Sequence, residues 1–268
     1  MKIITSTSLS GGQGKTTTVF FLGKMLAHKG YKVLFVDSDP QANLTFFLGH
    51  EIGPTDATIL EVIIENVPVG IRETITVTPE DGIRELTTVE GGWIIPASNA
   101  LERAQTYLSQ SGVDPSSQLK ERLNKVSDIF DFCLIDSPPQ RSHLSVACIG
   151  AADSIIIPAE AQVKGVGSVD RTVSLIREMK RKNACSANIL CILPFRDRWV
   201  GYNRTGESEE SINVMKEFGE EVLSATIRES EQYKKALNQG MLLDEIGYPQ
   251  LAYPFELIIE KLQVKVAA

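Results

Sequence analysis

A glycine-rich run close to the N-terminus constrains this chain more than any other feature. Residues 10–17 read Ser-Gly-Gly-Gln-Gly-Lys-Thr-Thr, and they lie between a short apolar run at 2–7 and a helical pattern at 15–29. In the order strand, glycine turn, helix, the backbone N–H groups of the turn and the positive end of the helix both face one anion. The run therefore predicts a phosphate loop on a strand–helix unit.

The residue types in this run fit separate parts of a nucleoside triphosphate with Mg²⁺. The glycines allow backbone N–H groups to turn inward, because a residue without Cβ adopts positive φ without strain. Lys15 is placed to reach the β- and γ-phosphates, and the hydroxyl of Thr16 is placed to hold Mg²⁺. The motif is a variant, since Leu9 occupies the first glycine position of G-x-x-x-x-G-K-[ST]. The expected nucleotide-binding residues of the run are Gly11, Gly12, Gln13, Gly14, Lys15, Thr16 and Thr17.

Carboxylates follow two other apolar runs, at the points where the predicted strands end. Asp37 and Asp39 come at the end of the run at 32–37, and Asp136 ends the run at 132–136. Because the carboxyl ends of parallel strands border the ligand crevice, we expect these side chains to lie near the phosphates. Asp136 suits the Mg²⁺ shell through a water, and Asp39 is placed to orient the attacking water. A lone Asp at a strand end is more often a cap or a turn, but three beside a phosphate loop favour a site.

Short apolar runs alternate with helical patterns along most of the sequence. Uninterrupted apolar runs indicate strands buried on both faces, and strand–helix alternation implies right-handed crossovers. We therefore expect a doubly wound α/β fold of the P-loop NTPase type, with a mostly parallel sheet, helices on both faces and one domain over 1–268. The stretch from 50 to 92 is less regular and is expected to form a short helix and an edge hairpin. The expected strands are 2–7, 32–37, 93–96, 132–136, 154–158 and 188–193, and the expected helices are 15–29, 142–151, 167–182 and 207–218.

The composition argues against several functional classes. The formal net charge is -7, which disfavours indiscriminate binding of polyanions, although local patches can still be basic. The four cysteines form no C-x-x-C pair and the three histidines are scattered, so we expect buried free thiols and no zinc site. No run approaches the ~18 apolar residues of a membrane span, and the N-terminus does not read as a signal peptide, which predicts a cytoplasmic protein.

Taken in order, the motifs of this chain resemble those of the ParA/MinD family of deviant Walker-box ATPases. GGQGKTTT at 11–18 resembles the family's K-G-G-x-G-K-T-T, and VLFVDSDPQANLT at 33–45 resembles its V-L-L-I-D-x-D-P-Q-G-N-x-T. Later blocks match in the same order along nearly the whole chain, and the spaced combination is far more specific than any single block. These later blocks are WIIPAS, FDFCLIDSPP, DSIIIPAEAQ, ILPFRDR and TIRESEQYKKALNQGMLLDE.

The resemblance implies ATP and Mg²⁺ as ligands, a nucleotide-sandwich homodimer, slow ATP hydrolysis and a partner protein that stimulates hydrolysis. It implies Asp39 as the catalytic carboxylate and Asp136 as the Walker B acid. Carried over by position, the implied residues are Lys15, Thr16, Asp37, Asp39 and Asp136 at the phosphates, and Pro194 to Arg196 at the adenine.

Ser10 is the departure from the family that matters most. It stands where the family has a signature lysine, which reaches across the dimer to the other subunit's phosphates. A serine carries no charge to offset a triphosphate, so the dimer forms differently, hydrolysis is slower, or another cation substitutes. Lys164 is the single basic residue of 159–166, which follows a strand at the same edge of the sheet, and Arg141 is the second candidate. Beside a triphosphate Lys164 would form charge-assisted hydrogen bonds, and the alternative is an ordinary solvated loop lysine.

The resemblance further implies nonspecific DNA, and hence the nucleoid, as a binding partner. Binding of this kind depends on contacts between basic side chains and phosphates. A membrane-associated, MinD-like alternative is weaker, because the apolar positions of 255–268 fit a final core-packing helix. The candidate DNA-binding residues, chosen from segments that resemble the family's DNA-contacting regions, are Arg198, Arg204, Arg228 and Lys234.

The expected cargo follows from the serine at position 10, which resembles the carboxysome-positioning branch of the family. That branch uses a distant lysine, as Lys164 would be here. Plasmid or chromosome partition is the alternative, since those systems share the same ATPase core.

An iron-protein reductase would need cysteines at a subunit interface, whereas Cys133 falls in an expected strand and Cys148 in an expected helix. A ligase or kinase would need a substrate pocket, for which the sequence shows no constellation.

Overall fold

A mostly parallel sheet forms the centre of the molecule. The computed structural model describes residues 1–53, 57–64, 82–101 and 114–262. Within these residues eight strands lie in the order β10-β7-β6-β1-β5-β2-β4-β3, and only β3 runs antiparallel to its neighbour. The strands are β1 (Lys2–Ser6), β2 (Val33–Asp37), β3 (Arg84–Glu85), β4 (Gly92–Ile95), β5 (Phe132–Asp136), β6 (Ser154–Glu160), β7 (Asn188–Asp197) and β10 (Ile227–Arg228).

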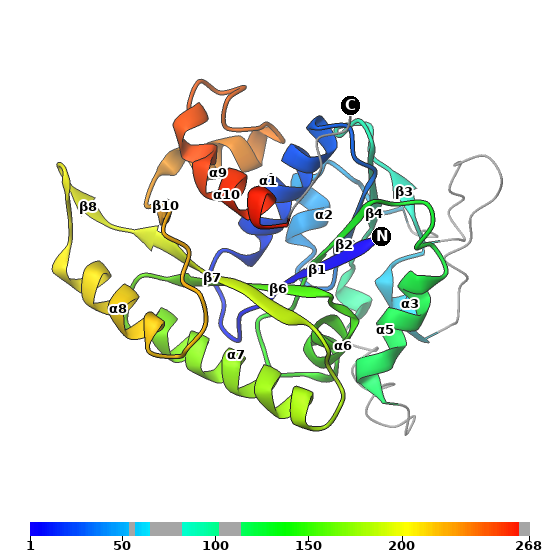
Figure 1. Cartoon of the computed structure of the whole chain (residues 1–268). Helices are drawn as coiled ribbons and strands as arrows, with labels where there is room; N and C mark the ends of the chain where they lie inside the picture. Colours follow the sequence, from blue (N-terminus) through cyan, green and yellow to red (C-terminus); the bar gives the residue numbers. More distant parts are fainter. Residues whose placement is uncertain (54–56, 65–81, 102–113, 263–268) are drawn as a thin grey trace.

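Helices cover both faces of this sheet, which confirms the expected fold class (Figure 1). One core cluster joins one face to four helices, namely α1 (Lys15–His28), α2 (Asn43–Phe47), α9 (Glu231–Gln239) and α10 (Tyr253–Lys261). Two clusters on the other face involve α3 (Ile59–Ile64), α5 (Pro115–Asn124), α6 (His143–Ala151), α7 (Val163–Arg181) and α8 (Gly206–Lys216). The remaining described elements are the hairpin β8 (Trp199–Val200) with β9 (Asn203–Arg204) and the 3-10 helices at Asn99–Leu101 and Pro249–Ala252.

The central strands show why the apolar runs are uninterrupted. Val33 and Phe35 of β2 pack into the core beside α1, whereas Leu34 and Val36 pack into the core on the opposite face. All four side chains are fully buried. Successive side chains of a strand point to opposite faces, so a strand covered by helices on both sides is apolar at every position.

The start of α7 differs from its expected start at residue 167. The helix begins at Val163, so Lys164 lies in its first turn rather than in a loop. Gly165 disfavours a helix on propensity alone, but here it is required by packing. A Cβ on Gly165 would lie 1.9 Å from the carbonyl oxygen of Glu160, at the end of β6. The close approach places the first turn of α7 directly against this strand end.

The irregular segment and the C-terminus are described in part. The expected short helix and edge hairpin between 50 and 92 correspond to α3 and to the antiparallel pair β3–β4, while 54–56 and 65–81 lie outside the described residues. Phe255, Ile258 and Ile259 of α10 are buried in the core, as expected of a core-packing helix, and 263–268 lie outside the described part. No helix among the described residues has the length and apolar character needed to cross a membrane.

Candidate functional site

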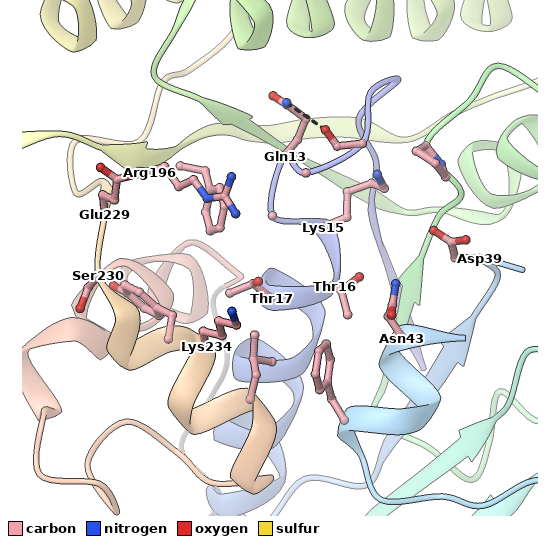
Figure 2. Close-up of a pocket in the computed structure, with 18 of the residues that line it drawn as sticks. Gln13, Lys15, Thr16, Thr17, Asp39, Asn43, Arg196, Glu229, Ser230 and Lys234 are labelled. Atoms are coloured by element: carbon pink, nitrogen blue, oxygen red, sulfur yellow. Dashed lines mark hydrogen bonds between the residues drawn. The ribbon is translucent and has the colours of Figure 1, made fainter. Parts of the chain in front are cut away.

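A cavity of about 660 Å³ opens at the carboxyl edge of the sheet, where the phosphate-loop candidate joins β1 to α1. Figure 2 shows Lys15, Thr16 and Thr17 in its centre, Asp39 and Asn43 on one side, and Arg196, Glu229, Ser230 and Lys234 on the other. All seven residues predicted along the run at 11–17 line the cavity. The other lining residues are Asp39, Gln41, Asn43, Phe47, Pro139, Phe195, Arg196, Arg228, Glu229, Ser230, Glu231, Tyr233, Lys234 and Leu237.

The backbone of the loop depends on two glycines in the left-handed region. Gly12 has φ 79° and Gly14 has φ 95°, and residues with a Cβ rarely adopt such values. A Cβ on Gly14 would also lie 2.6 Å from Cδ2 of Phe195, whereas a Cβ on Gly11 would meet nothing within 4 Å. Gly14 therefore combines a turn requirement with a close approach between the loop and the end of β7.

Lys15 occupies the position that the motif predicts for a phosphate ligand. It is 6% exposed, and its Nζ donates a hydrogen bond to the carbonyl oxygen of Ser10 at 3.2 Å. Burial lowers the pKa of Lys15, and the negative charges of Asp136 and Asp39 oppose this shift. A buried ammonium whose hydrogen bond is to a neutral carbonyl is suited to an anionic ligand, because a charge out of water needs a counter-charge.

Thr16 and Asp136 form the part of the site that fits a hydrated metal ion. The Thr16 hydroxyl donates to Oδ2 of Asp136 at 2.6 Å. Oδ1 of this buried carboxylate accepts no hydrogen bond from any described residue. Burial, followed by the charge of Asp37, raises the pKa of Asp136 to about 8. An oxygen ligand with free lone pairs beside a hydroxyl is what Mg²⁺ requires, so these residues fit the ion.

Asp37 and Asp39 occupy different positions although they are neighbours in sequence. Asp37 is fully buried, does not line the cavity, and accepts hydrogen bonds from Asp39 N (3.1 Å) and from the N (2.9 Å) and Oγ1 (2.8 Å) of Thr45. Burial raises its pKa to about 6. Asp39 lines the cavity, and its Oδ1 accepts from Gln41 N at 3.0 Å. Asp37 thus shapes the loop, and Asp39 presents its carboxylate to the ligand space.

The structure brings Lys164, and not Arg141, to the phosphate loop. The Nζ of Lys164 donates to the carbonyl oxygen of Gly11 at 3.2 Å, and this side chain is exposed. Arg141 instead forms an ion pair with Glu178 at 2.9 Å and does not line the cavity. Of the two proposed substitutes for the missing lysine, Lys164 therefore has the better position.

The far end of the cavity is built by β7, β10 and α9. Phe195 and Arg196 line it, while Pro194, which was predicted with them, does not. Ser230 and Tyr233, from the start of α9, were not predicted at all. The Ser230 hydroxyl caps α9 by accepting from Gln232 N at 3.2 Å, so a Ser-Glu-Gln start after a short strand was the available signal.

Two of the DNA-binding candidates are held in ion pairs. Arg198 pairs with Glu229 at 2.9 Å, and both side chains are about half exposed. Arg204 pairs at 2.9 Å with Asp197, whose side chain is fully buried. An exposed pair exchanges partners at little cost, whereas a pair with a buried carboxylate is expensive to break. Arg204 is therefore held in the fold more firmly than Arg198.

The other two DNA-binding candidates line the cavity at the phosphate-loop candidate. Lys234 extends from α9 into it (Figure 2). Arg228 borders the cavity and lies over the ring of Trp199, with its Cζ 4.1 Å from the ring centroid. Their positions favour a contact with nucleotide, and their role toward DNA stays a prediction.

The four cysteines are free and buried. Burial raises the pKa values of Cys133 and Cys148, so both thiols are held in the protonated form. Because they are buried within β5 and α6, neither lies at a surface where a cluster held between two subunits would need its ligands.

Comparison with known proteins gives the same family as the motifs. The family model described as an AAA domain matches residues 1–189. The maintenance of carboxysome distribution protein A of Gloeothece citriformis is 47% identical over 266 residues, which cover 99% of this chain and 98% of that protein. The protein of the same name from Synechococcus elongatus is 46% identical over 265 residues, covering 98% of this chain and 99% of its own length.

Solved structures agree with these relatives. A Cyanothece McdA variant in complex with ATP has a TM-score of 0.92 and 46% identity, and covers 100% of this chain and 98% of that chain. Cobyrinic acid a,c-diamide synthase from Mycobacterium smegmatis, with a bound ATP analogue and magnesium, has a TM-score of 0.76 and 26% identity, with 100% and 99% covered. From the family model and the full-length relatives together, the chain belongs to the ParA/MinD-type AAA-domain family of ATPases.

Proposed function

We propose that this ATPase binds ATP and Mg²⁺ in the cavity at the carboxyl edge of the sheet. The contact between Thr16 and Asp136, whose Oδ1 has no hydrogen-bond partner among the described residues, carries the proposal. Lys15 and the N–H groups of residues 11–17 hold the phosphates, and Thr16 with Asp136 holds the ion, directly and through water. Mg²⁺, when bound, neutralises charge on the phosphate oxygens.

Asp39 is the residue proposed to orient the attacking water. Its carboxylate lines the cavity on the side opposite Arg196 and Lys234 (Figure 2). Asp37 holds the backbone of Asp39 through a hydrogen bond from Asp39 N. A carboxylate held in this way can accept a hydrogen bond from water and fix its direction of approach.

ATP binding is proposed to close a sandwich homodimer in which Lys164 replaces the missing lysine. The ammonium of Lys164 contacts the neutral carbonyl of Gly11 and forms no ion pair in the part of the chain that the structure describes. It is thus a free, exposed cation at the rim of the phosphate loop. Such a cation can serve the triphosphate of a second copy, because a charge-assisted contact to phosphate is stronger than one to a carbonyl.

Light scattering with ATP and Mg²⁺ tests this role. Lys164→Ala is expected to stay monomeric with ATP, whereas Lys180→Ala, an exposed lysine on the same helix, dimerises like the parent chain. Ser10→Lys in the Lys164→Ala background is expected to restore dimerisation, because it returns a cation to the loop. Unchanged dimerisation of Lys164→Ala would remove Lys164 from the mechanism.

The cellular role is proposed from the relatives. Two full-length proteins with 46–47% identity are named for maintenance of carboxysome distribution, which supports carboxysomes as the cargo. In the proposal the dimer binds nonspecific DNA of the nucleoid, and an adaptor protein on the cargo stimulates hydrolysis. Deleting the gene should then cluster fluorescently labelled carboxysomes, while plasmid and chromosome segregation stay normal. Regular carboxysome spacing in the deletion strain would contradict this role.

DNA binding has its own test. Retention of random-sequence DNA should require ATP and fall steeply between low and physiological salt, because phosphate contacts release counterions. Arg198→Ala should weaken it without changing ATP affinity, since Arg198 does not line the cavity. Retention that is independent of ATP, or insensitive to salt, would argue against nucleoid binding.

A further inference from the structure

Glu160, at the end of β6, contacts residues from both ends of the nucleotide cavity without lining the cavity itself. Its side chain is 10% exposed. Oε1 accepts from Nη1 of Arg196 at 2.6 Å, and Oε2 accepts from Nε2 of Gln13 at 3.4 Å. One buried carboxylate therefore lies between the phosphate loop and the Arg196 end of the site.

The contact with Gln13 includes the backbone. The N–H of Glu160 donates to Oε1 of Gln13 at 2.9 Å, so the amide of Gln13 both donates to and accepts from the same residue. Gln13 is itself fully buried within the glycine-rich run. The tip of the phosphate loop is thus fixed to the end of β6, and the main-chain half of this contact does not depend on the carboxylate.

The contact with Arg196 depends on the carboxylate alone. Arg196 has φ 51°, an unfavourable backbone conformation for a residue with Cβ, and half of its side chain is exposed. Its guanidinium lies over the ring of Phe195, with Cζ 5.5 Å from the centroid. A long side chain on a strained backbone keeps one orientation only if a partner holds it, and Glu160 supplies the ion pair.

We propose that Glu160 is a positioning residue that fixes the Arg196–Phe195 end of the cavity relative to the phosphate loop. Its effect is to favour a complete nucleotide, which reaches both ends, over a bare polyphosphate, which reaches only the loop. This proposal rests on the proposed ATP site and adds a determinant of its specificity for the part of the ligand beyond the phosphates.

Steady-state ATP hydrolysis of Glu160→Gln tests the proposal. The amide keeps the shape of the side chain and an acceptor for Gln13, but it loses the charge that orients Arg196. We expect the KM for ATP to rise about tenfold, because a hydrogen bond between charged groups is lost. We expect kcat to stay within about twofold, because a contact made equally in ground state and transition state affects KM alone.

The second readout is the affinity for inorganic tripolyphosphate with Mg²⁺, measured by isothermal titration calorimetry. We expect its Kd to be the same for the parent chain and Glu160→Gln, because the phosphate loop keeps its contacts. Glu178→Gln is the matched control, since Glu178 is also ion-paired to an arginine but lies outside the cavity. Arg196→Met removes the same ion pair by changing its more exposed partner. This variant is used for the test if Glu160→Gln fails to fold.

Four results would overturn the proposal, and each points to a different cause. An unchanged KM in both Glu160→Gln and Arg196→Met would mean that the ion pair does not position the nucleotide. A lower kcat together with weaker tripolyphosphate binding would mean that Glu160 supports only the loop. If the parent chain binds neither ATP nor tripolyphosphate, the proposed ATP site itself fails. A double variant much weaker than either single one would show that Glu160 and Arg196 act separately.

Discussion

The two ends of the nucleotide cavity differ in how the chain builds them. The phosphate end comes from one continuous run at 11–17, together with Asp39 and Asp136 at the ends of neighbouring strands. The other end combines β7, β10 and the start of α9, which are separated in sequence and meet only in the fold. In the proposed site the phosphates are bound mainly by backbone groups and one local lysine, so that end is encoded locally. The other end depends on tertiary packing.

The largest expected effect falls on the locally encoded end. Lys15→Met keeps much of the side-chain volume but removes the cation, and kcat for ATP hydrolysis should fall by about 10² to 10³-fold, the usual effect of losing one preorganised charge contact. Lys29→Met, an exposed residue just after α1, should leave kcat unchanged. A drop of less than about tenfold would show that the loop binds the phosphates without this lysine.

A pair of glycine variants tests whether the two ends meet at Gly14. Gly14→Ala forces a Cβ into the left-handed region and against the ring of Phe195, and should lower the free energy of unfolding by about 2 kcal/mol. Gly11→Ala meets no neighbour and should change it by less than about 0.5 kcal/mol. Denaturant unfolding of the ligand-free variants measures both values. Equal stabilities would mean that the loop is free to move away from β7.

Asp136→Asn separates stability from function at the phosphate end. Burial raises the pKa of Asp136 from 3.8 to about 8. The stability that the protonated carboxyl contributes is therefore complete below pH 4 and is lost as the pH rises through about 8. Compared with the ligand-free parent chain, the variant should therefore be equally stable at pH 4 and more stable at pH 8, where the parent chain must ionise a buried carboxyl. It should bind ATP–Mg²⁺ more weakly at both pH values.

Unfolding curves across this pH range provide the check, with Asp170→Asn as a control for an exposed aspartate on α7. Asn keeps an acceptor for the Thr16 hydroxyl, so only the charge changes. A variant that is less stable than the parent at pH 8 would show that the ionised carboxylate stabilises the fold.

The smallest expected effect is at the packed end. Arg228 borders the cavity and stacks on Trp199. Arg228→Ala should weaken ATP binding by about threefold, an effect of the size expected from the loss of one partly exposed cation–π contact. Trp199 fluorescence should change in the same variant, because its ring loses the guanidinium above it. Lys235→Ala, the exposed neighbour of Lys234, should change neither. A loss of ATP affinity of about 10²-fold, as large as the effect expected of Lys15→Met on kcat, would erase the distinction between the two ends.

The sequence allowed the sheet and the phosphate end to be predicted closely. Apolar runs at 32–37 and 132–136 became β2 and β5, and Asp136 came to lie beside Thr16 as expected. These features depend on local pattern and on strand ends meeting at one edge of a parallel sheet. Lys164 could be selected for the same reason, although the start of α7 was predicted too late.

The other end of the site could not be predicted, because its contacts are made by residues distant in sequence. Glu160 lies within the block DSIIIPAEAQ, but the block assigns it no role, because its contacts form only when Gln13 and Arg196 are brought to it in the fold. Arg228 and Lys234 were predicted from the sequence as DNA-binding candidates, yet the packing of β10 and α9 places them at the cavity.

A crystal structure of the chain with ATP and Mg²⁺ tests the central claim most directly. The account predicts that one nucleotide spans both ends, with its phosphates within residues 11–17, the ion beside Thr16 and Asp136, and the base against Phe195 and α9. A nucleotide whose base lies in solvent, with Arg196 and Lys234 unmoved and without contact to it, would contradict the account.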